Sequence, residues 1–160
     1  AMLLAAVREA VGDAETVFDL FAGCGTFALP LAENARVHAV EGDAEMIAAL
    51  EGGWRKATGV KPLTTATRDL FRRPLLPDEL AKADAVVLDP PRAGAEAQVA
   101  EIIRAAVPRL AYVSCNPVSF ARDVQALVSA GYTLDWVQVV DQFRWSSHVE
   151  LAACLTLRQS

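Results

Sequence analysis

Short apolar runs alternate with longer amphipathic stretches along the whole chain. The short runs have the length of buried strands, and the longer stretches repeat their apolar residues at helical spacing. This alternation is typical of βαβ units, in which helices cover a mostly parallel sheet. The pattern predicts strands over residues 16–21, 36–41, 62–67, 85–89, 110–114, 132–141 and 149–157, and helices over 26–33, 44–58, 96–106 and 117–129.

The connection between the last two strands indicates how they run. Only the short segment 143–148 separates them, and it is too short for a crossover helix. We therefore expect the seventh strand to be antiparallel in an otherwise mostly parallel α/β sheet. Residues 1–11 predict an amphipathic helix rather than a signal peptide. With 160 residues, 53% of them hydrophobic, and no repeat or linker, the chain is expected to form one domain.

The charge of the chain bears on its partners. A formal net charge of -5 opposes nucleic-acid binding, which depends on Lys and Arg. Several arginines nevertheless fall in segments predicted at one edge of the sheet: Arg72, Arg73, Arg92, Arg122 and Arg144. A local basic patch can attract phosphates despite an acidic average, so nucleic acid stays open as a partner. No stretch approaches a membrane span, so a membrane partner is not expected.

The three cysteines, Cys24, Cys115 and Cys154, are widely spaced. Their spacing fits neither a disulfide framework nor a metal-ligand set. We therefore expect no metal and a reduced, cytoplasmic setting. Cys24 and Cys154 are interpreted as packing residues, as is His38 in the second predicted strand.

Side chains that can carry chemistry follow the ends of the predicted strands. Ligands bind open α/β sheets at the carboxyl edge of the parallel strands, and an antiparallel last strand begins at that same edge. The residues expected to converge there are Asp19, Glu41, Asp69, Asp89, Cys115 and Glu150.

The segment DLFAGCGTFALP, residues 19–30, reads as a strand, a glycine turn and a helix. Gly23 and Gly25 let the backbone approach a ligand, and Glu41 lies at a suitable distance to hold a ribose diol. A nicotinamide dinucleotide and S-adenosylmethionine both fit this pattern. Asp19 favours the second, because a carboxylate suits an ammonium group and repels a pyrophosphate. A glycine turn needed only for strand-to-helix packing is the plain alternative.

The segment VVLDPPRAG, residues 86–94, places a carboxylate and a guanidinium around two prolines. Pro90 and Pro91 stop the strand and fix the backbone, so Asp89 and Arg92 have little freedom. Arg92 suits a phosphate or a base carbonyl. An ordinary turn with a surface arginine is the alternative.

The segment YVSCNP, residues 112–117, ends a strand with a thiol just before a helix. Pro117 can occupy the first helical turn, and the positive end of the helix favours a thiolate at Cys115. Cys115 is therefore a candidate nucleophile, with a buried structural cysteine as the alternative. Glu150, the only charge on the last strand, is a candidate general base, and His148 could play that role instead.

Together DLFAGCGTFALP, DPPRAG, YVSCNP and DQFRWSSHVE resemble the RNA uracil-C5 methyltransferases, which make 5-methyluridine in transfer and ribosomal RNA. The resemblance covers nearly the whole chain and implies the Rossmann-like fold of class I S-adenosylmethionine-dependent methyltransferases. It implies that Cys115 is the nucleophile, that Glu150 accepts a proton and that Arg92 lies near the target base. The implied cofactor-binding residues are Asp19, Phe21, Gly23, Gly25, Thr26, Glu41, Asp69 and Asp89.

Members of this family usually carry an RNA-binding domain and a Phe-x-Gln-x-Asn segment ahead of the catalytic fold, and this sequence contains neither. Residues 1–160 are thus expected to be the catalytic domain of a longer enzyme that methylates tRNA or rRNA. Segment 52–61 also lacks the Asn-Ala pairing of the family, which bears on its adenine contacts. A binding module without catalysis and a nicotinamide-dependent oxidoreductase are the alternative functions.

Overall fold

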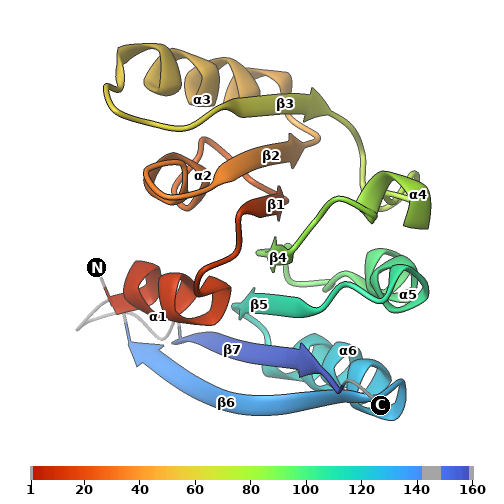
Figure 1. Cartoon of the computed structure of the whole chain (residues 1–160). Helices are drawn as coiled ribbons and strands as arrows, with labels where there is room; N and C mark the ends of the chain where they lie inside the picture. The colour runs from red at the N-terminus through yellow and green to blue at the C-terminus, as the bar shows by residue number, and fades with distance from the viewer. Residues whose placement is uncertain (1, 142–148, 159–160) are drawn as a thin grey trace.

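The computed structural model describes residues 2–141 and 149–158, and in them a seven-stranded sheet carries helices on both faces (Figure 1). The strands are β1 (Thr16–Leu20), β2 (Arg36–Glu41), β3 (Leu63–Thr67), β4 (Ala85–Leu88), β5 (Arg109–Ser114), β6 (Tyr132–Asp141) and β7 (Val149–Leu157). The helices are α1 (Met2–Val11), α2 (Ala28–Leu31), α3 (Ala44–Lys56), α4 (Pro77–Leu80), α5 (Glu96–Ala105) and α6 (Pro117–Ser129).

All seven predicted strands are confirmed. The central strand β4 is a fully buried apolar run, whereas β2 and β3 nearer the edge mix polar with apolar residues. Two helices differ from the prediction. Gly23 and Gly25 adopt positive φ, so residues 23–27 form turns and regular helix starts only at Ala28. The short helix α4 was not predicted, since a single turn is too short to show helical periodicity.

The strand order is β3-β2-β1-β4-β5-β7-β6. Strands β1 to β5 are parallel, and β7 is antiparallel to both β5 and β6, as the sequence predicted. The direction of the strand order reverses between β1 and β4. In folds of this type a ligand binds beside that reversal, at the carboxyl ends of the strands. The predicted connection at 143–148 lies outside the described residues.

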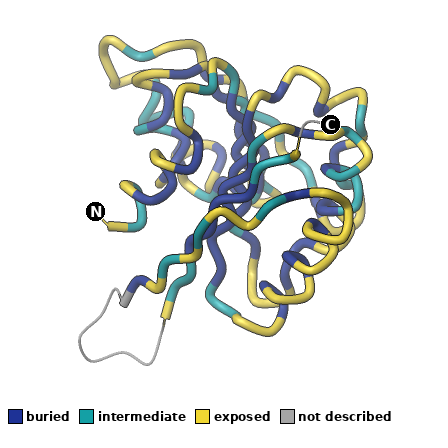
Figure 2. The backbone as a smooth tube through the Cα atoms, turned by 60° about the horizontal axis from the view of Figure 1, so that its bottom comes forward, coloured by how far each residue is buried: buried dark blue, intermediate teal, exposed yellow. Residues whose placement is uncertain are grey.

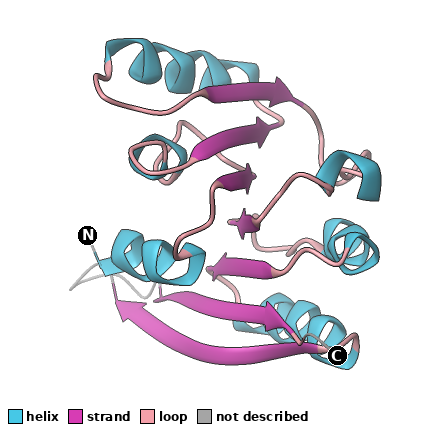
Figure 3. Ribbon diagram, in the orientation of Figure 1, coloured by secondary structure: helices cyan, strands magenta, loops and turns pink. Residues whose placement is uncertain are grey.

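Helices lie on both faces of the sheet (Figure 3), and the strands between them are largely buried (Figure 2). Two clusters of buried apolar residues pack the helices against the sheet, one on each face. On one face α1, α2 and α3 pack with residues such as Val7, Leu31 and Leu50, and on the other α4, α5 and α6 pack with residues such as Leu80, Ile102 and Leu127. The amphipathic helix predicted at the start of the chain is α1. Among the described helices, none has the length and apolar character needed to cross a membrane.

Local signals fix both ends of α6, the helix that follows β5. Asn116 caps its start by accepting a hydrogen bond from the Val118 N–H at 3.1 Å, and Pro117 takes the first helical position. Gly131, with φ of +109°, follows its end. Cys115 is therefore held directly ahead of a helix N-terminus.

Candidate functional site

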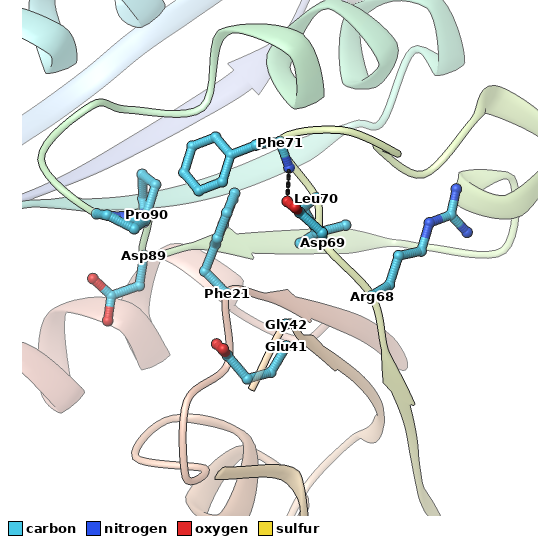
Figure 4. Close-up of a pocket in the computed structure, with 10 residues that line it drawn as sticks. Phe21, Glu41, Gly42, Arg68, Asp69, Leu70, Phe71, Asp89 and Pro90 are labelled. Atoms are coloured by element: carbon cyan, nitrogen blue, oxygen red, sulfur yellow. Dashed lines mark hydrogen bonds between the residues drawn. The ribbon is translucent and has the colours of Figure 1, made fainter. Parts of the chain in front are cut away.

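A cavity of about 480 Å³ opens at the carboxyl ends of β1, β2, β3 and β4 (Figure 4). This volume lies within the range of small-molecule sites in proteins. Its lining includes four residues that the sequence predicted to bind a cofactor, namely Phe21, Glu41, Asp69 and Asp89. The lining residues that were not predicted are Gly42, Arg68, Leu70, Phe71, Pro90 and Pro91.

Two aromatic rings form one wall of this cavity. The rings of Phe21 and Phe71 lie 5.3 Å apart between centroids and are tilted by 54° (Figure 4). Phe21 has a φ of +62°, a left-handed conformation that costs energy for a residue other than glycine. Phe71 is 48% exposed although it is aromatic. Phe71 was not predicted as a site residue. The signal that could have identified it is an aromatic residue shortly after the end of a strand.

The two glycines of the turn after β1 have different roles. A Cβ on Gly23 would meet no atom within 4 Å, so open space lies in front of this backbone. A Cβ on Gly25 would lie 3.0 Å from side-chain carbons of Leu29 and Leu50, so this glycine serves close packing. Of the two glycines predicted to bind a cofactor, only Gly23 faces open space.

The side chain of Glu41 ties the end of β2 to the glycine turn. Its Oε1 accepts a hydrogen bond from the Gly23 N–H at 3.0 Å, and its Oε2 accepts one from the Asp43 N–H at 2.9 Å. Thr26 and Cys24 are exposed. The interpretation of Cys24 as a small core residue was therefore wrong, because the turn directs it outward where no element covers it.

Asp69 shapes the loop after β3. Its Oδ1 accepts hydrogen bonds from the Phe71 N–H at 3.0 Å and from the Arg72 N–H at 3.4 Å. These bonds hold the backbone of Phe71 beside the cavity. Arg72 also lies 3.8 Å from Asp69 in an exposed ion pair.

Asp19 is fully buried at the base of this edge. Neither of its carboxylate oxygens has a hydrogen-bond partner among the described residues. Burial raises the pKa of Asp19 well above its ordinary value, and the charges of Asp89 and Glu41 raise it further, while the nearby backbone N–H of Ala28 partly offsets them. A buried carboxyl without a partner is costly, so the site favours a ligand that brings a cation or donors to it.

Asp89 continues the same acidic cluster. Burial raises its pKa to about 7, and the charge of Glu150 adds to this effect. Carboxyl groups from β1, β2, β7 and the end of β4 thus influence one another at one edge of the sheet. Within the described residues, no group of three or more metal-ligating side chains is arranged to hold a metal ion.

The register of β5 and β7 relates the two predicted catalytic residues. Ser114 pairs with Leu151 in this antiparallel ladder, so continuing the register by one residue places Cys115 opposite Glu150. Both residues are partly buried. Neither is among the residues that line the cavity, although the charge of Glu150 acts on Asp89, which is.

Some arginines of the predicted basic patch are held in ion pairs and are therefore less able to bind phosphates. Arg92 is exposed on the loop after β4, but Arg122 is engaged by Glu96 at 3.2 Å and by Asp123 at 3.1 Å. Arg144, and also His148 as the alternative base, lie outside the described residues. The patch is thus smaller than the sequence predicted, because side chains far apart in the sequence pair in the fold.

Cys154 and His38, the other two residues interpreted as packing residues, behave as predicted. Cys154 is buried, and burial together with the charge of Asp135 raises the pKa of its thiol to about 11. His38 shares a hydrogen bond of 2.7 Å between its Nδ1 and the Oγ1 of Thr64. Its ring packs edge-on against Phe18 at 5.1 Å.

Comparison with known proteins relates this chain to a protein family. The family model described as tRNA (uracil-5-)-methyltransferase matches residues 65–158. An RNA methyltransferase of Rhizobium meliloti is 56% identical over 145 residues, which are 91% of this chain and 35% of the relative. The 23S rRNA (uracil(1939)-C(5))-methyltransferase RlmD of Halomonas elongata is 41% identical over 150 residues, or 92% of this chain and 31% of the relative.

A solved structure shows the same fold. The tRNA (uracil-54, C5)-methyltransferase of Pyrococcus abyssi, in complex with S-adenosyl-L-homocysteine, superimposes with a TM-score of 0.83 at 30% identity. The match covers 97% of this chain and 37% of that one. The chain thus spans about a third of the length of the proteins it matches. It has the Rossmann-like fold of class I methyltransferases and belongs to the tRNA (uracil-5-)-methyltransferase family.

Proposed function

We propose that this protein is the catalytic part of an enzyme that methylates carbon 5 of uridine in RNA with S-adenosylmethionine. The observation that carries the proposal is the β5–β7 register, in which Ser114 pairs with Leu151. Continued by one residue, this register would set Cys115 opposite Glu150 at the edge where the cavity opens. The family and the likeness to a structure that holds S-adenosyl-L-homocysteine support it. The RNA class, tRNA or rRNA, is left open by relatives of both kinds.

The residues around the cavity fit this cofactor. The unpartnered carboxyl of Asp19 suits an ammonium group, and the open space at Gly23 admits a ligand against the backbone. Glu41 is proposed to hold the ribose hydroxyls, with Phe21, Asp69 and Asp89 around it. Gly25 and Thr26 are proposed to act through the shape of the turn. When bound, the sulfonium of the cofactor supplies the methyl group.

The chemistry of the chain's own residues follows from the electronic character of uracil. Carbon 5 of the ring is a poor nucleophile until a thiolate adds to carbon 6. The Cys115 sulfur forms this bond and leaves an enolate whose electron pair makes carbon 5 reactive. After carbon 5 has gained its methyl group, Glu150 removes the proton from it, and the electron pair expels the Cys115 thiolate.

The substrate must reach this thiol. A base inside a stack is inaccessible, so we propose that a flipped or single-stranded uridine enters beside the exposed side chain of Arg92. The acidic average of the chain is compatible with this because other parts of the longer enzyme would supply much of the RNA affinity. A cytoplasmic location stays a prediction.

Two substitutions in the full-length enzyme test the mechanism. Cys115→Ala is expected to abolish formation of 5-methyluridine, since no thiol remains to activate the ring. Cys24→Ala is the matched control, because Cys24 is an exposed cysteine of the same fold. Nucleoside analysis of RNA after reaction is the measurement. Full activity of the Cys115 variant would refute the covalent mechanism.

Glu150→Gln is expected to stop the reaction one step later. The carbon 5 proton then stays in place, so the Cys115–RNA bond persists and appears as a denaturation-resistant band on a gel. Adding Cys115→Ala to this variant must remove the band. A Glu150→Gln enzyme that turns over normally, or that releases tritium from carbon 5 at the wild-type rate, contradicts the role of Glu150.

A further inference from the structure

The loop between β4 and α5 is held by side chains of α6 and its cap. The carbonyl oxygen of Arg92 accepts two hydrogen bonds, from the Oγ of Ser119 at 2.7 Å and from the Nδ2 of Asn116 at 2.9 Å. The Arg92 side chain is exposed, so these bonds fix its backbone and leave its guanidinium available.

Two further residues of α6 hold the next part of the same loop. The Nη2 of Arg122 donates to the carbonyl oxygen of Ala93 at 3.0 Å, and the Ala95 N–H donates to the Oδ2 of Asp123 at 2.8 Å. Asp123 is only 1% exposed. Its Oδ1 accepts from Arg122 and its Oδ2 also accepts from the Tyr112 hydroxyl, so this buried carboxylate is fully paired.

The loop also touches α6 closely at Gly94. Its φ of +80° favours glycine, and a Cβ there would lie 2.6 Å from the Nη2 of Arg122, 2.9 Å from the Oδ2 of Asp123 and 3.0 Å from the Cβ of Ser119. The glycine of DPPRAG thus lets the loop lie directly on the hydrogen-bonding side chains of α6.

The same helix start shapes the turn that carries Cys115. Asn116 caps α6 through the Val118 N–H, and its own backbone N–H donates to the Oγ of Ser114 at 3.0 Å. Asn116 therefore contacts the cysteine turn through its backbone N–H and the Arg92 carbonyl through its side chain. The two segments form a single hydrogen-bonded unit.

We propose that Asn116, Ser119, Arg122 and Asp123 form a positioning clamp that sets Arg92 relative to Cys115 for the reaction on RNA. The inference rests on the proposed function, in which these two residues act on the same base. The cost of a misplaced loop is large, because an error of about 1 Å can lower a rate by about two orders of magnitude. None of the four clamp residues needs to touch the substrate.

The test is a double variant of the full-length enzyme, Asn116→Ser with Ser119→Ala. It removes both donors to the Arg92 carbonyl, yet serine remains a good helix cap. Ser129→Ala, at the exposed far end of α6, is the matched control. We expect kcat to fall by about ten-fold to a hundred-fold. The KM for S-adenosylmethionine and the melting temperature are expected to stay near those of the control.

Amide hydrogen exchange gives a readout that does not depend on activity. The double variant is expected to exchange faster in residues 92–95 and no faster in β2 and α3. Asp123→Asn is expected to show the same local change with a lower melting temperature, because a buried pairing is lost. A double variant with the kcat of the control, or with unchanged exchange at 92–95, overturns the clamp.

The outcomes of the two proposals can be told apart. If the wild-type enzyme forms no 5-methyluridine, the proposed function fails. If the wild type is active but the double variant loses kcat, cofactor KM and stability together, with faster exchange throughout the fold, the clamp fails as a positioning device while the function stands. Loss of kcat with faster exchange confined to residues 92–95 supports both.

Discussion

Single buried carboxyls give this site its electrostatic character. Asp19 has no hydrogen-bond partner for either oxygen among the described residues, and Asp89 has its pKa raised to about 7 by burial and by Glu150. Ionising such groups costs folding free energy, because a low-dielectric interior solvates charge poorly. The site therefore lowers the stability of the fold and favours the binding of a cation.

The substitution Asp89→Asn tests whether ionisation of Asp89 lowers the stability of the fold. The folded pKa of Asp89 exceeds its unfolded value of 3.8, so the folded state binds more protons between about pH 4 and pH 7. Wild-type stability therefore falls as the pH rises through this window and is constant above it. The neutral variant lacks this fall, so its free energy of unfolding should exceed that of the wild type at pH 8. The difference should be at most about 4 kcal/mol, because a shift of one pKa unit corresponds to about 1.36 kcal/mol.

Denaturant unfolding at pH 4 and pH 8 is the measurement. The difference between Asp89→Asn and the wild type should be small at pH 4 and largest at pH 8. Asp13→Asn, at an exposed turn, is the control and should show no such dependence. If this difference does not change with pH, ionisation of Asp89 does not reduce the free energy of unfolding.

At the scale of elements, local sequence determines where a helix begins, whereas packing determines which substitutions inside it are tolerated. Asp43 begins α3 by accepting a hydrogen bond from the Glu45 N–H at 2.9 Å, and Asn116 begins α6 in the same manner. Such caps are local and could be read from the sequence. The two adjacent glycines inside α3, Gly52 and Gly53, look equivalent in the sequence and differ only in what packs on them.

Gly52→Ala and Gly53→Ala are expected to differ in their effects on stability. A Cβ on Gly52 meets no atom within 4 Å, so alanine should raise the free energy of unfolding by about 0.5 to 1 kcal/mol through helix propensity. A Cβ on Gly53 would lie 2.9 Å from the Cδ1 of Leu29, so the gain should be smaller or reversed. Thermal unfolding of both variants is the measurement, and equal shifts would contradict the packing argument.

At the scale of the whole molecule, the sheet order assembles the site from distant segments. The reversal between β1 and β4 opens the cavity, and the antiparallel β7 returns Glu150 to the same edge. Phe21 and Phe71 form a wall although they lie on loops after β1 and β3. The site is thus a property of the strand arrangement and not of any one motif.

Ligand binding to the whole molecule should appear as a shift in melting temperature. S-adenosyl-L-homocysteine at about a hundred times its Kd should stabilise the folded state by about 2.7 kcal/mol. NAD should give no shift, because the acidic side chains of Glu41 and Asp69 that line the cavity repel a pyrophosphate. Asp19→Asn should raise the melting temperature without ligand and reduce the shift with it. A larger shift with NAD than with S-adenosyl-L-homocysteine would overturn the cofactor proposal.

Local patterns in the sequence are enough to specify the seven strands, the antiparallel last strand, Pro117 at the start of α6 and the convergence of acidic side chains at one edge. These features follow from periodicity, turn residues and connection length, which act over a few neighbouring residues. Tertiary packing alone determines that Phe71 completes the cavity wall, that Cys24 is exposed and that Arg122 pairs with Glu96. Those outcomes depend on which surfaces pack together across long separations in the chain, and no local pattern of residues encodes them.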